Sequence, residues 1–317
     1  MDLNKAILYG QLVNAAYDVP TTDLGNRAGK TVDAGLGPNK LTFEVLASIY
    51  ANDLATDASK KKGLNATVSI GLLLWQAGTG EAVVAIRGTV GLLEWFQDAK
   101  FDTEKCPFLA GAGETENGFT DMYKSFAVGT PKGPSVTESL ATIFGSRQVN
   151  SLTVCGHSLG GALATLQALD AAANSKFNNP NVYTYASPRT GDGQFVSTYN
   201  RMLPNTFRIA NSIDVVPKLP LPPPYDHVQG LYALSAVQIF PPAILVEPNP
   251  ICEHILETYL HLLSKLAGGE VLQLKQGCGV PAGLGKFWNH LWMEFRSFNQ
   301  LTNDIRAEAG GILGARL

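Results

Sequence analysis

The spacing of apolar residues along the chain predicts an alternation of helices and short strands. Residues 2–17 place apolar side chains at helical intervals and predict an opening helix, followed by Gly-, Asp- and Asn-rich loops. Two apolar runs at 67–75 and 81–86 flank an Ala-Gly-Thr-Gly turn and predict a pair of strands. Later segments predict helices over 131–145 and 161–173 and strands over 152–155, 181–186 and 206–210. Strands that alternate with helices need crossover connections, so we expect an α/β fold with a mainly parallel central sheet and helices on both faces.

The end of the chain follows this pattern less clearly. The apolar stretch over 231–250 contains adjacent prolines, so we expect a cap-like insertion and not a membrane-spanning helix. Residues 279–317 are expected to form a helical extension with an aromatic stripe that faces the core or, alternatively, lipid or a second copy. The stripe consists of Phe287, Trp288, Leu291, Trp292, Phe295 and Phe298. A chain of 317 residues can form one α/β domain, and we expect a single domain over 1–317.

Composition narrows the class of function. Hydrophobic residues make up 45% of the chain, charged residues make up 16%, and the net charge is −3. These values favour a large core and give no attraction for nucleic acid. The sequence contains no H-E-x-x-H, phosphate-binding loop or dinucleotide fingerprint, so we expect neither a metal nor an organic cofactor. The first residues do not have the pattern of a secretory signal peptide, and the localisation stays open.

The four cysteines show no C-x-x-C spacing and therefore no zinc or redox motif. Cys155 lies in an apolar strand pattern, and we expect it to be a buried thiol. A Cys252–Cys278 or a Cys106–Cys278 disulfide remains open, because spacing alone does not choose a pairing.

A candidate catalytic nucleophile, Ser158, lies in the stretch V-C-G-H-S-L-G-G-A-L-A. This stretch places a strand, a tight turn and an Ala-rich helix in succession, which is the context of the G-x-S-x-G nucleophile elbow. We expect Gly156 and Gly160 to avoid collisions with the backbone of the turn itself, and Gly161 to let the helix pack close to the strand. The start of the helix brings backbone N–H groups and the positive end of the helix dipole beside a reacting carbonyl.

The two other members of a catalytic triad should follow the serine, the acid first and the histidine second. Asp214 lies in the loop N-S-I-D-V-V-P-K-L-P after a predicted strand and is expected to orient the histidine, with Asp226 as a weaker alternative. The histidines that compete as the base are His227, His254, His261 and His290. We favour His254, because the loop-to-helix junction P-N-P-I-C-E-H can carry a side chain to the carboxyl edge of the sheet. His261 lies two turns deeper in the helix and is more simply a packed helix residue.

Several segments resemble, in order, those of one known family. A-I-R-G-T-V-G-L-L-E-W-F-Q-D is similar to its R-G-[ST] segment, and the Ser158 stretch is similar to its elbow. N-S-I-D-V-V-P-K-L-P resembles its acid loop, and C-E-H-I-L-E-T-Y-L resembles its base segment, which favours His254. The family is that of the class 3 (fungal-lipase-like) lipases, in the α/β-hydrolase superfamily, and the resemblance covers residues 74–262. The chain departs from the family pattern at Glu116, where the family has a histidine, and at Ala186, which replaces a usual glycine.

The resemblance implies further parts of a lipase site. The backbone N–H groups of Thr89 and Leu159 would form the oxyanion hole, and the Thr89 hydroxyl can also point at the oxyanion. Residues 90–98 would form a movable lid, whose apolar side chains are Leu92, Leu93, Trp95 and Phe96. Fixed core packing of these four side chains is the alternative interpretation.

These features predict a serine carboxylic-ester hydrolase, specifically a triacylglycerol lipase that works through an acyl-enzyme intermediate. Its partner would be an acyl-ester or lipid substrate, met at a lipid–water interface. A phospholipase A1 or a feruloyl-type esterase on the same scaffold remains an alternative, because pocket shape sets the acyl group and the motifs do not. A catalytically silent, hydrolase-like binding module is the alternative outside the enzyme class.

Overall fold

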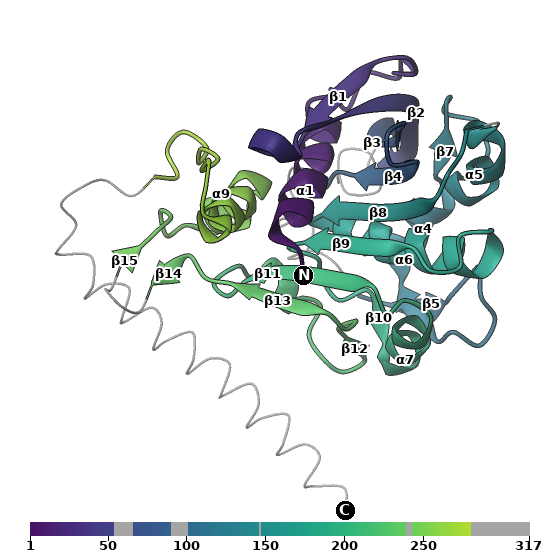
Figure 1. Cartoon of the computed structure of the whole chain (residues 1–317). Coiled ribbons are helices and arrows are strands. Elements are labelled where there is room, and N and C mark those ends of the chain that lie inside the picture. Colours follow the sequence, from purple (N-terminus) through teal and green to yellow (C-terminus); the bar gives the residue numbers. More distant parts are fainter. Residues whose placement is uncertain (54–65, 90–100, 146, 239–242, 280–317) are drawn as a thin grey trace, which may run out of the picture.

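The alternation of strands and helices builds one central sheet with helices on both of its faces, as Figure 1 shows. The computed structural model describes residues 1–53, 66–89, 101–145, 147–238 and 243–279. The α/β fold with a largely parallel central sheet, expected from the sequence, is confirmed.

The main sheet contains nine strands among the described residues, in the order β1-β2-β3-β4-β8-β9-β11-β13, with β7 paired to β2. The strands are β1 (Thr31–Ala34), β2 (Leu41–Asp53), β3 (Ala66–Gln76), β4 (Glu81–Ile86), β7 (Ala127–Val128), β8 (Ser151–His157), β9 (Asn181–Tyr185), β11 (Thr206–Asn211) and β13 (Leu231–Leu234). From β4 to β13 all neighbours run parallel, and β1 to β4 pair in antiparallel fashion. β4 and β8 are buried almost throughout, because helices cover both faces of the parallel part.

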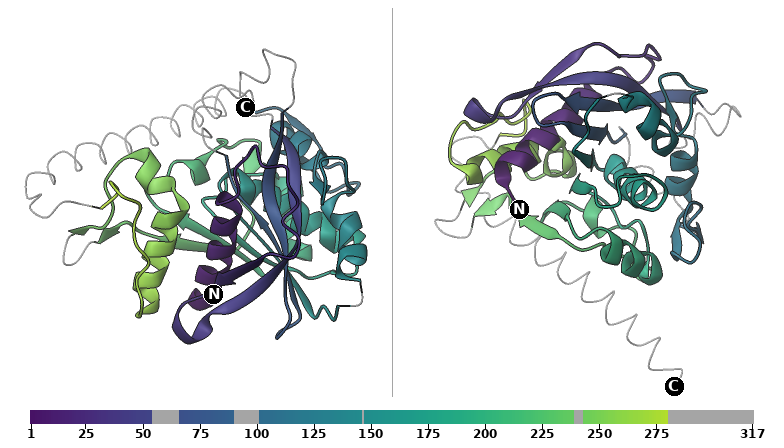
Figure 2. Two further views of the ribbon diagram at one scale, coloured as in Figure 1. Left: turned by 90° about the horizontal axis from the view of Figure 1, so that it is seen from above. Right: turned by 45° about the vertical axis from the view of Figure 1, so that its right-hand side comes forward.

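Two groups of helices cover the two faces of the sheet (Figure 2). The helices are α1 (Leu3–Tyr17), α4 (Asn117–Lys124), α5 (Val136–Phe144), α6 (Leu159–Asn174), α7 (Gly193–Met202), α8 (Pro250–His254) and α9 (Leu256–Ala267), with short 3-10 turns η1 (Gly37–Asn39) and η2 (Val216–Lys218). α1 and α9 pack on one face, whereas α4, α5, α6 and α7 pack on the other. None of the helices in the described ranges combines the length and the apolar character that crossing a bilayer requires.

Smaller sheets lie beside the main one. One has the order β12-β10-β6-β5, and the other pairs β14 with β15. Their strands are β5 (Thr103–Lys105), β6 (Glu114–Glu116), β10 (Gly191–Asp192), β12 (Tyr225–Asp226), β14 (Val237–Gln238) and β15 (Ala243–Ile244). The stretch 231–250 therefore contributes an edge strand of the main sheet, a short hairpin and the start of α8. Its role as a cap over the site stays a prediction, as does the single-domain organisation.

Helix ends explain where the structure differs from the predicted boundaries. The helix expected over 131–145 begins only at Val136, because Ser135 caps it and forms a reciprocal capping box with Glu138. The prediction of loops after the first helix was wrong in part, because strands β1 and β2 occupy residues 31–34 and 41–53. The predicted lid side chains, the aromatic stripe and the extension beyond Gly279 lie outside the described residues.

Candidate active site

Ser158 lies on a sharp turn between β8 and α6, with φ 62° and ψ −129°. A positive φ is uncommon for any residue except glycine, and such strain is typical of functional turns. A Cβ placed on Gly156 would lie 2.0 Å from the carbonyl oxygen of Gly160, so the turn's own backbone excludes a side chain there, as expected. The reason expected for Gly160 was wrong. Its Cβ would lie 2.4 Å from the carbonyl oxygen of Ile86, at the end of the neighbouring strand.

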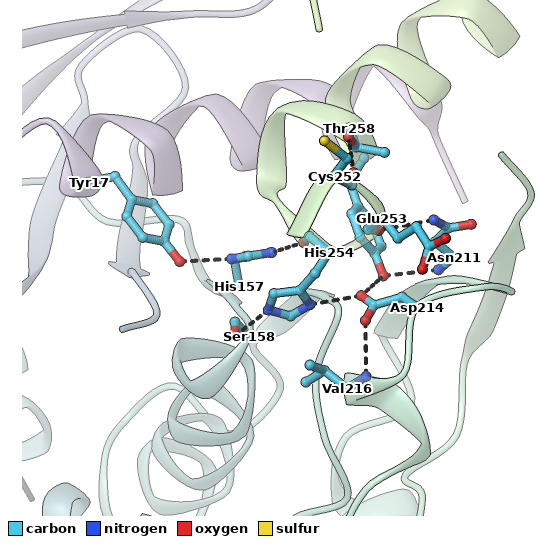
Figure 3. A network of polar contacts seen from close by, with 11 residues as sticks. Tyr17, His157, Ser158, Asn211, Asp214, Val216, Cys252, Glu253, His254 and Thr258 are labelled. Atoms are coloured by element: carbon cyan, nitrogen blue, oxygen red, sulfur yellow. Dashed lines mark hydrogen bonds and ion pairs between the residues drawn. The ribbon is translucent and has the colours of Figure 1, made fainter. Parts of the chain in front are cut away.

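The three predicted triad side chains meet where β8 and β11 end, with Ser158 after β8, Asp214 after β11 and His254 at the end of α8 (Figure 3). Ser158 Oγ lies 2.7 Å from His254 Nε2, and His254 Nδ1 lies 2.9 Å from Asp214 Oδ2. The Ser158 residue is 1% exposed, and the His254 and Asp214 side chains are 12% and 0% exposed. Because the carboxylate can only accept, Nδ1 of His254 carries a proton, and Nε2 of the neutral ring can accept the proton of Ser158.

The carboxylate of Asp214 is buried, and both of its oxygens accept hydrogen bonds. Oδ2 accepts from His254 Nδ1 and, at 2.7 Å, from the Tyr259 hydroxyl, while Oδ1 accepts from the backbone N–H of Val216 at 2.9 Å. Burial and then the charge of Asp214 raise the pKa of Tyr259 well above its usual value, so its hydroxyl stays a donor. The Tyr259 oxygen also accepts from the backbone N–H of Asn211 at 3.0 Å. A buried carboxylate is tolerated when its oxygens are bonded in this way.

A second chain of hydrogen bonds runs through His157, the residue before the nucleophile (Figure 3). His157 Nε2 lies 2.8 Å from the backbone carbonyl of His254, so Nε2 donates and Nδ1 accepts from the Tyr17 hydroxyl at 2.8 Å. The Tyr17 oxygen in turn accepts from the backbone N–H of Gly88 at 2.8 Å. Burial and the nearby His254 lower the pKa of His157 well below its usual value, which keeps the ring neutral. The chain thus links the R-G-T loop to the backbone of the base.

The described competitors His227, His261 and Asp226 form their hydrogen bonds with backbone groups and not with Ser158. His227 Nε2 donates to the carbonyl of Pro217 at 2.5 Å, and burial is the main cause that lowers its pKa to about 3. His261 Nδ1 donates to the carbonyl of Leu272 at 2.7 Å, as a packed helix residue would. Asp226 is exposed and accepts from the backbone N–H of the following residue. His290 lies outside the described residues.

The two residues expected to form an oxyanion hole come from segments that adjoin the nucleophile. Leu159 is the first residue of α6, so its N–H has no acceptor within the helix. A Cβ placed on Gly88 would lie 2.8 Å from the Cβ of Ser158, so the R-G-T loop packs directly against the elbow. Thr89 follows in the chain. The role of both N–H groups as oxyanion donors stays a prediction.

The two departures from the family pattern differ in their surroundings. Glu116 caps α4, where its Oε2 accepts from the backbone N–H of Phe119 at 2.7 Å. It is 3% exposed, and burial raises its pKa to about 7. Ala186 adopts φ 52°, a conformation that glycine takes more readily.

The structure shows which of the two possible disulfides forms. Cys252 and Cys278 form a disulfide with a Cα–Cα distance of 5.3 Å. Cys106 and Cys155 are free and buried, as expected for Cys155. Across the described ranges, no group of three or more His, Cys, Asp or Glu side chains is arranged to hold a metal ion.

Sequence reasoning missed the supporting residues around the triad. Tyr17 and Asn211 bond groups near His254 across separations of 140 and 42 residues, and Thr258 bonds the carbonyl of Cys252, six residues before it. Only the Tyr259 contact had a signal, because the base segment of the resembled family places a tyrosine shortly after its histidine. No local pattern marks the end of the first helix as a neighbour of the elbow.

Comparisons with known proteins find similarity to lipases. The model of the family "Lipase (class 3)" matches residues 83–223. Phospholipase A1-II 6 of Oryza sativa subsp. japonica is 27% identical over 87% of this chain and 79% of its own length. Secreted mono- and diacylglycerol lipase 1 of Fusarium solani is 28% identical over 69% of this chain and 59% of its own length.

A solved structure shares the fold. The crystal structure of mono- and diacylglycerol lipase from Aspergillus oryzae aligns with a TM-score of 0.55 and 23% identity, over 74% of this chain and 80% of that one. The matched family model spans β4, the R-G-T loop, the elbow and the acid loop. The chain is therefore similar to class 3 lipases over residues 83–223, and its lipase relatives support a serine ester hydrolase.

Proposed function

We propose that this protein hydrolyses the carboxylic esters of acylglycerols, with Ser158 as nucleophile, His254 as general base and Asp214 as the acid that orients the base. The observation that carries this proposal is the continuous chain from Ser158 Oγ to His254 Nε2 and from His254 Nδ1 to Asp214 Oδ2, at 2.7 and 2.9 Å. These distances lie within the reach needed for proton transfer from a nucleophile to its base.

The reaction follows from the donor and acceptor roles. Ser158 Oγ attacks the ester carbonyl carbon while its proton moves to His254 Nε2, and Asp214 stabilises the imidazolium that forms. The imidazolium then protonates the leaving alcohol, and an acyl-enzyme remains on Ser158. Water repeats the sequence with the same histidine and releases the fatty acid. The N–H groups of Leu159 and Thr89 are the proposed donors to the oxyanion, and one such donor is typically worth about 3–4 kcal/mol.

A glycerolipid substrate is supported by the relatives. Fusarium solani and Aspergillus oryzae proteins with matching sequence or fold are named mono- and diacylglycerol lipases. The burial of Ser158 supports a further proposal, that the groups around it must rearrange at a lipid–water interface before a bulky ester can reach Oγ.

A second candidate is phospholipase A1 activity, because the rice relative that matches 87% of the chain carries that name. The class of lipid depends on the shape of the binding pocket and not on the triad.

A panel of emulsified substrates tests both candidates. We expect the wild type to release fatty acid from triacylglycerol or diacylglycerol faster than from phosphatidylcholine, and Ser158→Ala to release none. The reverse preference would favour the phospholipase. Equal hydrolysis by the Ser158→Ala variant would contradict a serine ester hydrolase mechanism at this site. Rates measured below and above the solubility limit of a short-chain triacylglycerol test the interfacial step, which predicts a steeper rise above that limit.

A further inference from the structure

His254 stands at the last position of a helix that is too short to hold itself together. α8 has five residues, Pro250–His254, and helices of this length are not stable in water without tertiary contacts. Ile255 then turns to an extended conformation, with ψ 148°, before α9 begins. The base is therefore not carried rigidly by the longer helix that follows it.

Side chains from three other elements bind the last three carbonyl groups of α8 (Figure 3). Thr258 Oγ1 donates to the carbonyl of Cys252 at 2.5 Å, and Asn211 Nδ2 donates to that of Glu253 at 3.0 Å. His157 Nε2 donates to the carbonyl of His254. The final carbonyls of a helix have no partner within it, so these contacts replace the missing bonds.

The covalent attachment of α8 lies two residues before the base. The Cys252–Cys278 disulfide joins α8 to the segment that follows α9, and both cysteines are nearly fully buried. The carbonyl of Cys278 also accepts from the backbone N–H of Glu247 at 2.9 Å, and the Asn249 side chain caps the N–H of Cys252 at 2.9 Å. One disulfide thus secures both the loop before α8 and the helix itself.

We propose that the Cys252–Cys278 disulfide is a positioning bond for the general base. It holds α8 so that His254 Nε2 stays within hydrogen-bond distance of Ser158 Oγ. The inference rests on the proposed function, because it assigns a catalytic consequence to a bond that touches neither substrate nor reacting atoms. A displacement of about 1 Å at reacting groups can reduce turnover about a hundredfold. Loss of the bond should therefore lower kcat much more than it changes KM.

The direct test compares Cys252→Ala/Cys278→Ala with the wild type on a soluble p-nitrophenyl ester, below the melting temperature of both proteins. We expect kcat to fall about tenfold to a hundredfold and KM to stay within about twofold. Cys106→Ala is the matched control, since it removes a buried free thiol and leaves the bond intact. A folded double variant with kcat within about twofold of the wild type would overturn the inference. Absence of Ser158-dependent hydrolysis in the wild type would instead overturn the proposed function.

If the double variant does not fold, reversible reduction of the disulfide in the wild type tests the inference instead. Dithiothreitol supplies two electrons and two protons to the bond, which yields two thiols, and the reagent closes to its own cyclic disulfide. Mass spectrometry after alkylation reports the fraction reduced at Cys252 and Cys278. We expect kcat to fall in proportion to that fraction and to return on reoxidation. Full alkylation of both thiols with unchanged kcat would contradict the inference.

Discussion

Replacing Asp214 by asparagine should switch the proton from one nitrogen of His254 to the other. Oδ1 of Asp214 accepts from the backbone N–H of Val216, so the amide oxygen of the variant must take that place. The amide NH2 group then occupies the Oδ2 position, 2.9 Å from His254 Nδ1, and donates to it. His254 must then carry its proton on Nε2, where it faces Ser158 Oγ and can no longer accept the serine proton.

The magnitude follows from the loss of the base. A wrong histidine tautomer in a catalytic triad lowers kcat by about 10⁴, which corresponds to about 5 kcal/mol of transition-state stabilisation. The opposite amide orientation would set its NH2 group against the N–H of Val216 and leave a buried donor unsatisfied, at about 1–3 kcal/mol. In the preferred orientation the Tyr259 hydroxyl loses its acceptor, so a modest loss of stability should accompany the loss of activity.

The assay is steady-state hydrolysis of a soluble p-nitrophenyl ester, with thermal unfolding as a check on the fold. Asp214→Asn should retain KM within a few-fold and lose nearly all kcat. Asp226→Asn is the matched control, because that carboxylate is exposed and lies outside the triad, and its kinetics should equal those of the wild type. A folded Asp214→Asn protein that keeps more than about a tenth of the wild-type kcat would refute the tautomer argument.

Three further predictions concern the side chains of Tyr259, Thr89 and Glu116. Tyr259→Phe removes a donor to Asp214 and leaves the buried N–H of Asn211 unsatisfied. The free energy of unfolding in urea should therefore drop by about 2–4 kcal/mol, and a drop below about 0.5 kcal/mol would contradict the hydrogen-bond network around Asp214. Thr89→Val keeps the backbone N–H and removes the hydroxyl, so kcat should fall at least tenfold and up to about a thousandfold, and unchanged kcat would exclude the hydroxyl from oxyanion binding. Glu116 has a folded-state pKa of about 7 against an ordinary value of 4.5, so its stabilising contribution is full below pH 4.5 and is lost as the pH rises to about 7. The stability of the wild type relative to Glu116→Gln should therefore fall by up to about 3 kcal/mol over that range in chemical denaturation, and a constant difference would contradict the burial of this carboxyl.

The parallel half of the sheet and the elbow were predictable because their signals are local. Only Ser158 separates β8 from α6, so the apolar strand, the glycines of the turn and the Ala-rich helix are continuous in the sequence. β2 was not predicted, because the sequence analysis assigned its residues to loops. Its pairing with β3 and β1 is set by contacts that no short window of sequence displays.

The sequence left several histidines as candidates for the base, and three-dimensional contacts favour His254. His254 bonds Ser158 and Asp214, whereas His227 and His261 each bond a backbone carbonyl. The supporting contacts of Tyr17 and Asn211 could not be predicted, because they join residues 140 and 42 positions apart in the sequence. The cysteine pairing could not be predicted for the same reason, because the fold of the segment from α8 past α9 brings Cys252 to Cys278.

The central claim is that Ser158 is the nucleophile activated by His254, and covalent labelling tests it most directly. Diethyl p-nitrophenyl phosphate should transfer its diethylphosphoryl group to Ser158 Oγ and release p-nitrophenolate, with the mass added to the Ser158 peptide alone and with parallel loss of esterase activity. Ser158→Ala should stay unlabelled, and Asp214→Asn should react far more slowly. Labelling at another residue, or complete labelling of Ser158 with retained activity, would contradict the account.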